Sequence, residues 1–166
     1  MSFNINRSQF IRGDIRGRIQ RLRPPWHLPD VKFVDQCTAC KECIEVCPEG
    51  ILLTDKNGLP KVSFRKGECT FCGECARACP TQALNSDTSQ PAWTLKAVLN
   101  DKCLPLNGVV CFSCADECET TAISLRQIVG GVSIPRFDLE ACTGCGACYR
   151  VCPTSAIEIK PHGDTQ

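Results

Sequence analysis

The chain has 166 residues, a formal net charge of +1 and sixteen cysteines. No apolar run approaches the roughly 18 residues that a transmembrane helix needs, and the basic N-terminus lacks the apolar stretch of about 7–15 residues that is typical of a secretory signal. We therefore expect no transmembrane segment and a cytoplasmic location, where reduced thiols are free to bind metal.

Residues 1–30 form the first predicted region, a basic amphipathic arm. Apolar residues from Phe10 to Leu22 recur at helical spacing with arginines on the other faces, and Arg23-Pro24-Pro25-Trp26 ends this pattern. We interpret the arm as a docking segment for an acidic, partly apolar protein partner, with a solvated basic helix and a membrane-surface helix as alternatives. Its candidate partner-binding residues are Arg12, Arg16, Arg18, Arg21, Arg23 and Trp26.

Three cysteine runs share the spacing C-x2-C-x2-C-x3-C, and each is followed by proline. They consist of Cys37, Cys40, Cys43 and Cys47; of Cys69, Cys72, Cys75 and Cys79; and of Cys142, Cys145, Cys148 and Cys152. This is the ligand spacing of bacterial ferredoxins that bind 4Fe–4S clusters. A structural zinc site usually pairs two short ligand units across a longer loop, which these runs do not do. The spacing therefore predicts iron–sulfur ligation.

The other four cysteines form an irregular run. It consists of Cys103, Cys111, Cys114 and Cys118, with seven residues in the first gap and Glu119 in place of proline. A loop that contains Pro105 and Gly108 must return Cys103 to the cluster. We expect four 4Fe–4S clusters, or three if this run is not a site. The alternative for Cys103 is a free or structural thiol beside a labile or three-iron cluster.

Pairs of runs are expected to exchange ligands. In two-cluster ferredoxins the first three cysteines of a run bind one cluster and the fourth binds the other. This rule gives four sites: Cys37, Cys40, Cys43 and Cys79 (site I); Cys69, Cys72, Cys75 and Cys47 (site II); Cys142, Cys145, Cys148 and Cys118 (site III); and Cys103, Cys111, Cys114 and Cys152 (site IV). Because such sites hold the chain together, we expect the protein to be largely unfolded without iron. Nucleic acid is not an expected partner, because the thiolates around the clusters make the remaining body acidic.

Short hairpins and helices are predicted between the cysteines. The hairpin strands span 51–54 with 61–64, around Asn57-Gly58, and 122–125 with 132–134, around Gly130-Gly131. Short helices are predicted at 41–46, 74–78 and 147–151, each before a proline that cannot continue the helix. The polar segment from Asn85 to Pro91 is predicted to be a linker. The predicted fold class is α+β, with two tandem bacterial two-cluster ferredoxin-like modules over 31–86 and 87–166 and an N-terminal basic helical arm.

The arginine-rich start, the Arg23-Pro24-Pro25-Trp26 segment and the irregular run together resemble the NapF family of ferredoxin-type accessory proteins of the periplasmic nitrate reductase system. The resemblance covers nearly the whole chain. It implies a cytoplasmic iron–sulfur protein that contacts the catalytic molybdoenzyme subunit of periplasmic nitrate reductase. There it would assist loading of that subunit's own 4Fe–4S cluster before export.

An electron-transfer role is the alternative, in which the chain is a ferredoxin or a wire subunit that passes low-potential electrons to a redox partner. An enzyme with its own substrate is not expected. The sequence has no P-loop, no dinucleotide-binding fingerprint and no catalytic dyad, and its ligating thiolates are expected to be occupied by the clusters. The first two functions share every cluster residue, and the N-terminal arm is the feature that favours the accessory role.

Overall fold

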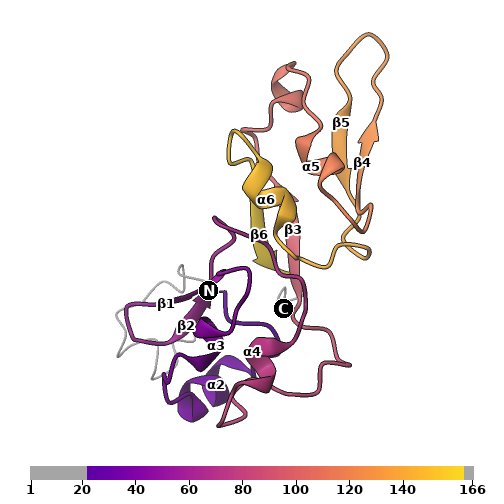
Figure 1. Ribbon diagram of the computed structural model, residues 1–166. Coiled ribbons are helices and arrows are strands. Elements are labelled where there is room, and N and C mark those ends of the chain that lie inside the picture. Colours follow the sequence, from indigo (N-terminus) through magenta and orange to yellow (C-terminus); the bar gives the residue numbers. More distant parts are fainter. Residues whose placement is uncertain (1–21, 163–166) are drawn as a thin grey trace, which may run out of the picture.

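The computed structural model describes residues 22–162, which form short helices and two-stranded sheets (Figure 1). The first half of this part holds α2 (Asp30–Gln36), α3 (Glu42–Glu45), β1 (Leu52–Thr54), β2 (Pro60–Val62) and α4 (Glu74–Arg77). The second half holds β3 (Leu95–Leu99), the 3-10 helix η1 (Pro105–Asn107), α5 (Ser113–Asp116), β4 (Ile123–Arg126), β5 (Ile134–Phe137), α6 (Ala147–Val151) and β6 (Ile157–Pro161). A small mixed α and β fold was predicted and is confirmed. No helix among the described residues is long and apolar enough to cross a membrane.

The short helices α3, α4 and α6 follow directly from the cysteine spacing. Each carries the third cysteine of its run and follows a residue with positive φ, namely Lys41 (71°), Gly73 (77°) and Gly146 (91°). The reversal before each helix turns the chain sharply between the second and third cysteine. A proline after the fourth cysteine then prevents the helix from continuing. All three helices were predicted, to within two residues at each end.

Both predicted hairpins are present. Strands β1 and β2 pair antiparallel, with Leu53 opposite Lys61. In their turn the carboxylate of Asp55 accepts hydrogen bonds from the backbone of Asn57 (2.8 Å) and Leu59 (3.1 Å). Strands β4 and β5 pair antiparallel over four residue pairs, and β5 begins two residues later than predicted and extends to Phe137.

The second half contains a strand pair that was not predicted. Strand β3 pairs antiparallel with β6 over five residue pairs, from Leu95 opposite Pro161 to Leu99 opposite Ile157. This pair joins the beginning of the second half to its end. In the sequence, the irregular run, the β4–β5 hairpin and the last regular run all lie between these two strands. Figure 1 shows α5 and the β4–β5 hairpin beyond the β3–β6 pair.

Residues 22–29 pack against the first half rather than extending away from it. The amide of Val62 donates to Leu22 O (2.7 Å), and the amide of Leu28 donates to Ala83 O (3.0 Å). His27 forms an isolated antiparallel bridge with Leu84. Residues 22–29 of the predicted arm thus belong to the folded body.

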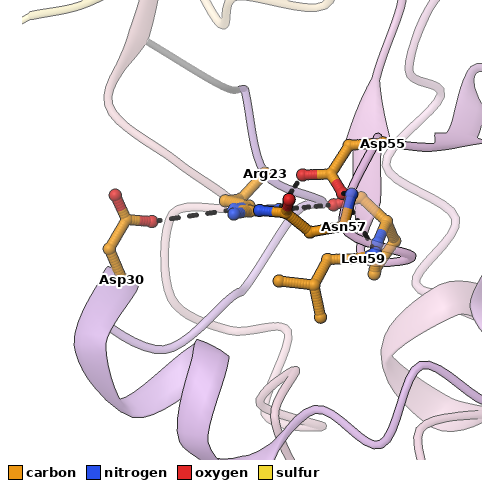
Figure 2. Close-up of polar contacts among 6 residues, drawn as sticks. Arg23, Asp30, Asp55, Asn57 and Leu59 are labelled. Carbon is orange, nitrogen blue, oxygen red and sulfur yellow. Dashed lines mark hydrogen bonds and ion pairs between the residues drawn. The ribbon is translucent and has the colours of Figure 1, made fainter. Parts of the chain in front are cut away.

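Two of the candidate partner-binding residues are buried in this packing. Arg23 is 5% exposed and Trp26 is 7% exposed. Figure 2 shows the Arg23 guanidinium between Asp30 and Asp55, with Nη1 at 3.4 Å from Asp55 Oδ2. The same group lies 5.2 Å from the centre of the Phe33 ring, and the indole nitrogen of Trp26 donates to Gln90 O (2.8 Å).

Both side chains are thus engaged within the chain in this structure, and their binding to a partner stays a prediction. The guanidinium is occupied by carboxylates of its own chain, and the indole is covered by the linker. The other four candidates, Arg12, Arg16, Arg18 and Arg21, lie outside the described residues.

Candidate iron–sulfur centres

The cysteines gather around cavities in the combinations expected from ligand exchange. One pocket is lined by the cysteines of site I, Cys37, Cys40, Cys43 and Cys79. A second is lined by those of site II, Cys47, Cys69, Cys72 and Cys75. A third is lined by those of site IV, Cys103, Cys111, Cys114 and Cys152. In each case the fourth cysteine comes from the neighbouring run.

Site III is indicated by the electrostatics of Cys148. Its pKa is raised to about 12, first by burial and then by the nearby thiols of Cys145 and Cys142, with Cys114 and Cys118 adding to the effect. Cys118 comes from the irregular run, so the thiols near Cys148 include the fourth ligand predicted for site III.

The thiols of sites I, II and IV line the walls of three pockets. A 4Fe–4S cluster has four irons and four cysteine ligands, so its thiolates are spread around the cluster.

Burial disfavours the thiolate form of these cysteines unless a positive charge is near. Desolvation is the largest cause that raises the pKa of Cys43, Cys69 and Cys75 to about 12. A bound metal ion reverses this preference, because a coordinating thiol is deprotonated outright. Iron binding and folding are therefore expected to be coupled at these sites.

Hydrogen bonds to the sulfurs differ between sites. Backbone amides donate to Cys152 Sγ from Ala156 (3.2 Å) and to Cys142 Sγ from Ala97 (3.5 Å). Burial raises the pKa of Cys152, but hydrogen bonds from Ala156 and Thr154 outweigh it and lower the pKa below its usual value. Site IV therefore contains a thiol whose pKa is lowered by hydrogen bonds from the protein itself.

A threonine hydroxyl lies beside the fourth cysteine of three runs. The oxygen–sulfur distances are 3.8 Å for Thr81 and Cys79, 3.6 Å for Thr120 and Cys118, and 3.8 Å for Thr154 and Cys152. These threonines were not among the predicted site residues. Their signal is present in the sequence, because each follows its cysteine by two residues.

Cys103 reaches site IV through a compact loop. Its residue is buried, and the loop turns through η1 to Gly108, whose φ of 78° suits glycine. The side-chain amide of Asn107 donates to Cys103 O (2.9 Å) and Asp101 O (2.9 Å), which closes the loop onto its own beginning. The long first gap of the irregular run therefore places Cys103 in the same cavity wall as Cys111 and Cys114.

Sites II and III adjoin each other where the two halves meet. The amide of Cys69, in site II, donates to the carbonyl of Cys145, in site III (2.8 Å). Phe64 packs edge-on against Trp93 at 5.9 Å between ring centres, and Trp93 donates from its indole nitrogen to Thr143 O (2.9 Å). The two inner sites are thus connected by a direct backbone hydrogen bond beside an aromatic cluster.

Comparison with known families agrees with this geometry. A model described as "4Fe-4S dicluster domain" matches residues 36–83, and one described as "4Fe-4S binding domain" matches residues 135–158. The irregular run lies outside both matched ranges. The chain is therefore an iron–sulfur protein of the ferredoxin type.

Related proteins identify the family within this class. The chain is 39% identical to the ferredoxin-type protein NapF of Haemophilus influenzae, over 94% of each chain, and 38% identical to that of Escherichia coli K12, over 95% of each. It is also 35% identical to the methylamine utilization ferredoxin-type protein MauM of Methylophilus methylotrophus, over 84% of this chain and 69% of that one. The chain belongs to the NapF family of ferredoxin-type proteins.

Proposed function

We propose that this protein is a cytoplasmic maturation factor for the catalytic molybdoenzyme subunit of periplasmic nitrate reductase. It would assist the loading of that subunit's 4Fe–4S cluster before export, without catalysing a reaction on a substrate of its own. The observation that carries this proposal is the 39% identity to NapF over nearly the full length of both chains.

We also propose that the protein carries four 4Fe–4S clusters, which are arranged as two tandem two-cluster modules with exchanged ligands. The cysteine-lined cavities of sites I, II and IV and the grouping of thiols around Cys148 support this assignment. Four clusters correspond to about sixteen iron atoms in each chain, and three clusters to about twelve.

Cysteine substitution tests the irregular site. We expect Cys103→Ser and Cys111→Ser to lower the iron content of anaerobically purified protein by the same amount, because both residues line the site IV cavity. Cys111 serves as the matched control, since it belongs to the regular C-x2-C-x3-C part of the run. An unchanged iron content in Cys103→Ser, beside a loss in Cys111→Ser, would show that Cys103 is not a ligand.

The basic arm is proposed to bind the catalytic subunit through Arg12, Arg16, Arg18 and Arg21. Because none of these four arginines is among the cysteines that line the cluster sites, a variant with all four changed to alanine is expected to keep its iron and lose capture of the catalytic subunit. A control variant changes four exposed basic residues of the body, Lys56, Lys66, Lys102 and Arg126. Equal capture by the arm variant and the control would remove the arm from the proposal.

Electron transfer to a redox partner is the second candidate function. Its support is the 35% identity to MauM, whose name links the same type of protein to methylamine utilization. The iron content of the catalytic subunit distinguishes the two functions. If the subunit from cells without this protein lacks iron, the maturation role holds. If it is fully loaded but slowly reduced, the electron-transfer role replaces it.

A further inference from the structure

The irregular run has more residues between its first two cysteines than ligation requires. The three regular runs connect their first two cysteines with two residues, whereas seven residues separate Cys103 from Cys111. The added residues form η1 and the segment after it, and they leave the side chains of Leu106, Val109 and Val110 exposed. The longer loop therefore brings apolar side chains to the surface as well as returning Cys103 to site IV.

The exposed apolar side chains continue onto the β4–β5 hairpin. Helix η1 packs against β5, and Pro105 of η1 and Pro135 of β5 line the site IV pocket together. Ile128 and Val129, in the turn of the hairpin, are exposed. Figure 1 shows the hairpin at the end of the molecule remote from α2, α3 and α4.

We call this group of side chains the apolar end. It consists of Leu106, Val109, Val110, Phe112, Ile128 and Val129. In the described part of the first half, the exposed large apolar residues Val31, Val46 and Leu53 lie instead on α2, after α3 and on β1. Single exposed apolar side chains are normal on a soluble protein, but a group of them usually belongs to an interaction surface.

The charges around the apolar end are basic. Residues 102–115 and 122–137 include no Asp or Glu, and the nearest acids along the chain from the loop are Asp101 and Asp116. Arg126 and Arg136 lie on one face of the hairpin, are exposed, and form no side-chain ion pair or hydrogen bond with another described residue. A complementary protein surface would therefore have an apolar centre bordered by acidic residues.

We propose that the apolar end binds the catalytic subunit of periplasmic nitrate reductase, at a patch of that subunit that is apolar with an acidic border. This inference rests on the proposed function and adds a surface of the folded body to the basic arm. A second copy of this chain does not meet the requirement, because a symmetric contact would bring the arginines of both copies together. Leu104 and Pro105 of the same loop line the site IV pocket, so the bound subunit would lie next to site IV.

Anaerobic calorimetric titration of the iron-loaded full chain with purified, cluster-free catalytic subunit tests the proposal. A variant that combines Val110→Ser with Val129→Ser is expected to bind about tenfold more weakly, because two apolar side chains no longer become buried. The matched control combines Val31→Ser with Leu53→Ser in the first half and is expected to bind like the unmodified chain. Val31 is 63% exposed and Val110 is 69% exposed, so neither variant removes a core side chain.

The two arginines give a second measurement on the same surface. Arg126→Gln combined with Arg136→Gln is expected to weaken binding about threefold at low ionic strength. The control combines Arg65→Gln with Lys66→Gln, which are exposed in the first half, and is expected to leave the affinity unchanged. The difference should disappear near 1 M salt, where the screening length is about 3 Å. An equal loss in the control would contradict an acidic border opposite the hairpin.

The outcomes separate this inference from the proposed function. If the Val110 and Val129 variant binds as tightly as its control while the arm variant loses binding, the apolar end is not the docking surface and the proposed function stands. If the unmodified chain does not bind the catalytic subunit, both are contradicted. Concentration-dependent self-association of the unmodified chain that the Val110 and Val129 variant abolishes would assign the apolar end to a second copy and overturn the proposal.

Discussion

The two halves hold similar cysteine sites in different ways. In the second half, five residue pairs between β3 and β6 join the chain before the irregular run to the chain after the last run. In the first half, the part of the chain from Leu22 onward has an isolated bridge at the equivalent place, between His27 and Leu84. Buried side chains add to this bridge, with Arg23 packed on Phe33 and Trp26 bonded to Gln90. The same ligand geometry can thus be supported by a backbone ladder or by side chains.

Iron removal is expected to destabilise both halves more than any of the substitutions considered below. Structural metal sites contribute about 10–16 kcal/mol in small zinc-binding peptides, and neither half has a large apolar core to replace such a contribution. We predict that anaerobic chelation abolishes most amide hydrogen-exchange protection. Residual protection is expected in β3 and β6, because their ladder has five residue pairs, and not in residues 22–29. Full protection of both segments in the iron-free chain would contradict the prediction.

The substitution Arg23→Ala is expected to have the next largest effect on stability. Its side chain is 4% exposed and that of its partner Asp55 is 3% exposed. Removal of one member of a buried ion pair leaves the other charge uncompensated, at about 3–5 kcal/mol. We therefore expect Arg23→Ala to lower the free energy of unfolding by about this amount, measured by denaturant titration of the iron-loaded protein. The control Arg77→Ala breaks an exposed pair with Glu74 and is expected to change stability by less than about 1 kcal/mol.

Features set by local sequence were predicted in both halves, whereas contacts between distant segments were not. Asn57-Gly58 and the prolines after the cysteines act through local backbone geometry, so the hairpins and short helices were recognisable. The β3–β6 pair joins strands at opposite ends of the second half, and no local pattern in 95–99 specifies its partner. Arg23 belongs to an arginine-rich segment, and its burial depends on Asp55, which the β1–β2 turn brings to it.

The cysteines themselves were the most predictable part of the site, because their spacing reflects the cluster directly. The residues that distinguish one site from another were not predicted. Glu49 and Thr81 occupy equivalent positions after a Cys-Pro pair, and the sequence alone does not show that such a hydroxyl lies beside the sulfur. The three-dimensional position of Glu68, whose Oε2 is buried without a hydrogen-bond partner, also depends on the fold.

The junction between the halves gives a smaller and more specific test. Gly146 has a φ of 91°, and a Cβ atom there would overlap the Phe64 ring of the first half. Gly130, in the β4–β5 turn, has a φ of 73° and open space around the same position. Both alanine substitutions incur about 1–2 kcal/mol of backbone strain, and the overlap adds about 1–3 kcal/mol for Gly146→Ala alone.

We expect the iron-loaded Gly146→Ala variant to have a lower melting temperature than the iron-loaded Gly130→Ala variant. Gly146→Ala should also alter the fluorescence of Trp93 in the folded protein more than Gly130→Ala does. The reason is that the Phe64 ring, which packs against Trp93, must move. Equal melting temperatures for Gly146→Ala and Gly130→Ala would show that the close approach of the halves does not persist in solution.

The smallest expected effect concerns an ion pair between the two cysteine runs of the second half. Arg150 Nη2 lies 3.0 Å from Glu117 Oε1, which links the last run to the irregular run, whereas Arg77 pairs with Glu74 within α4. Both Arg150 and Glu117 are more than one third exposed, so a double-mutant cycle with alanine should give a coupling of about 0.2–1 kcal/mol. The coupling should vanish near 1 M salt, where the screening length is about 3 Å. A coupling that persists at that salt concentration would instead indicate that the pair is shielded from solvent and contributes to holding the two runs of the second half together.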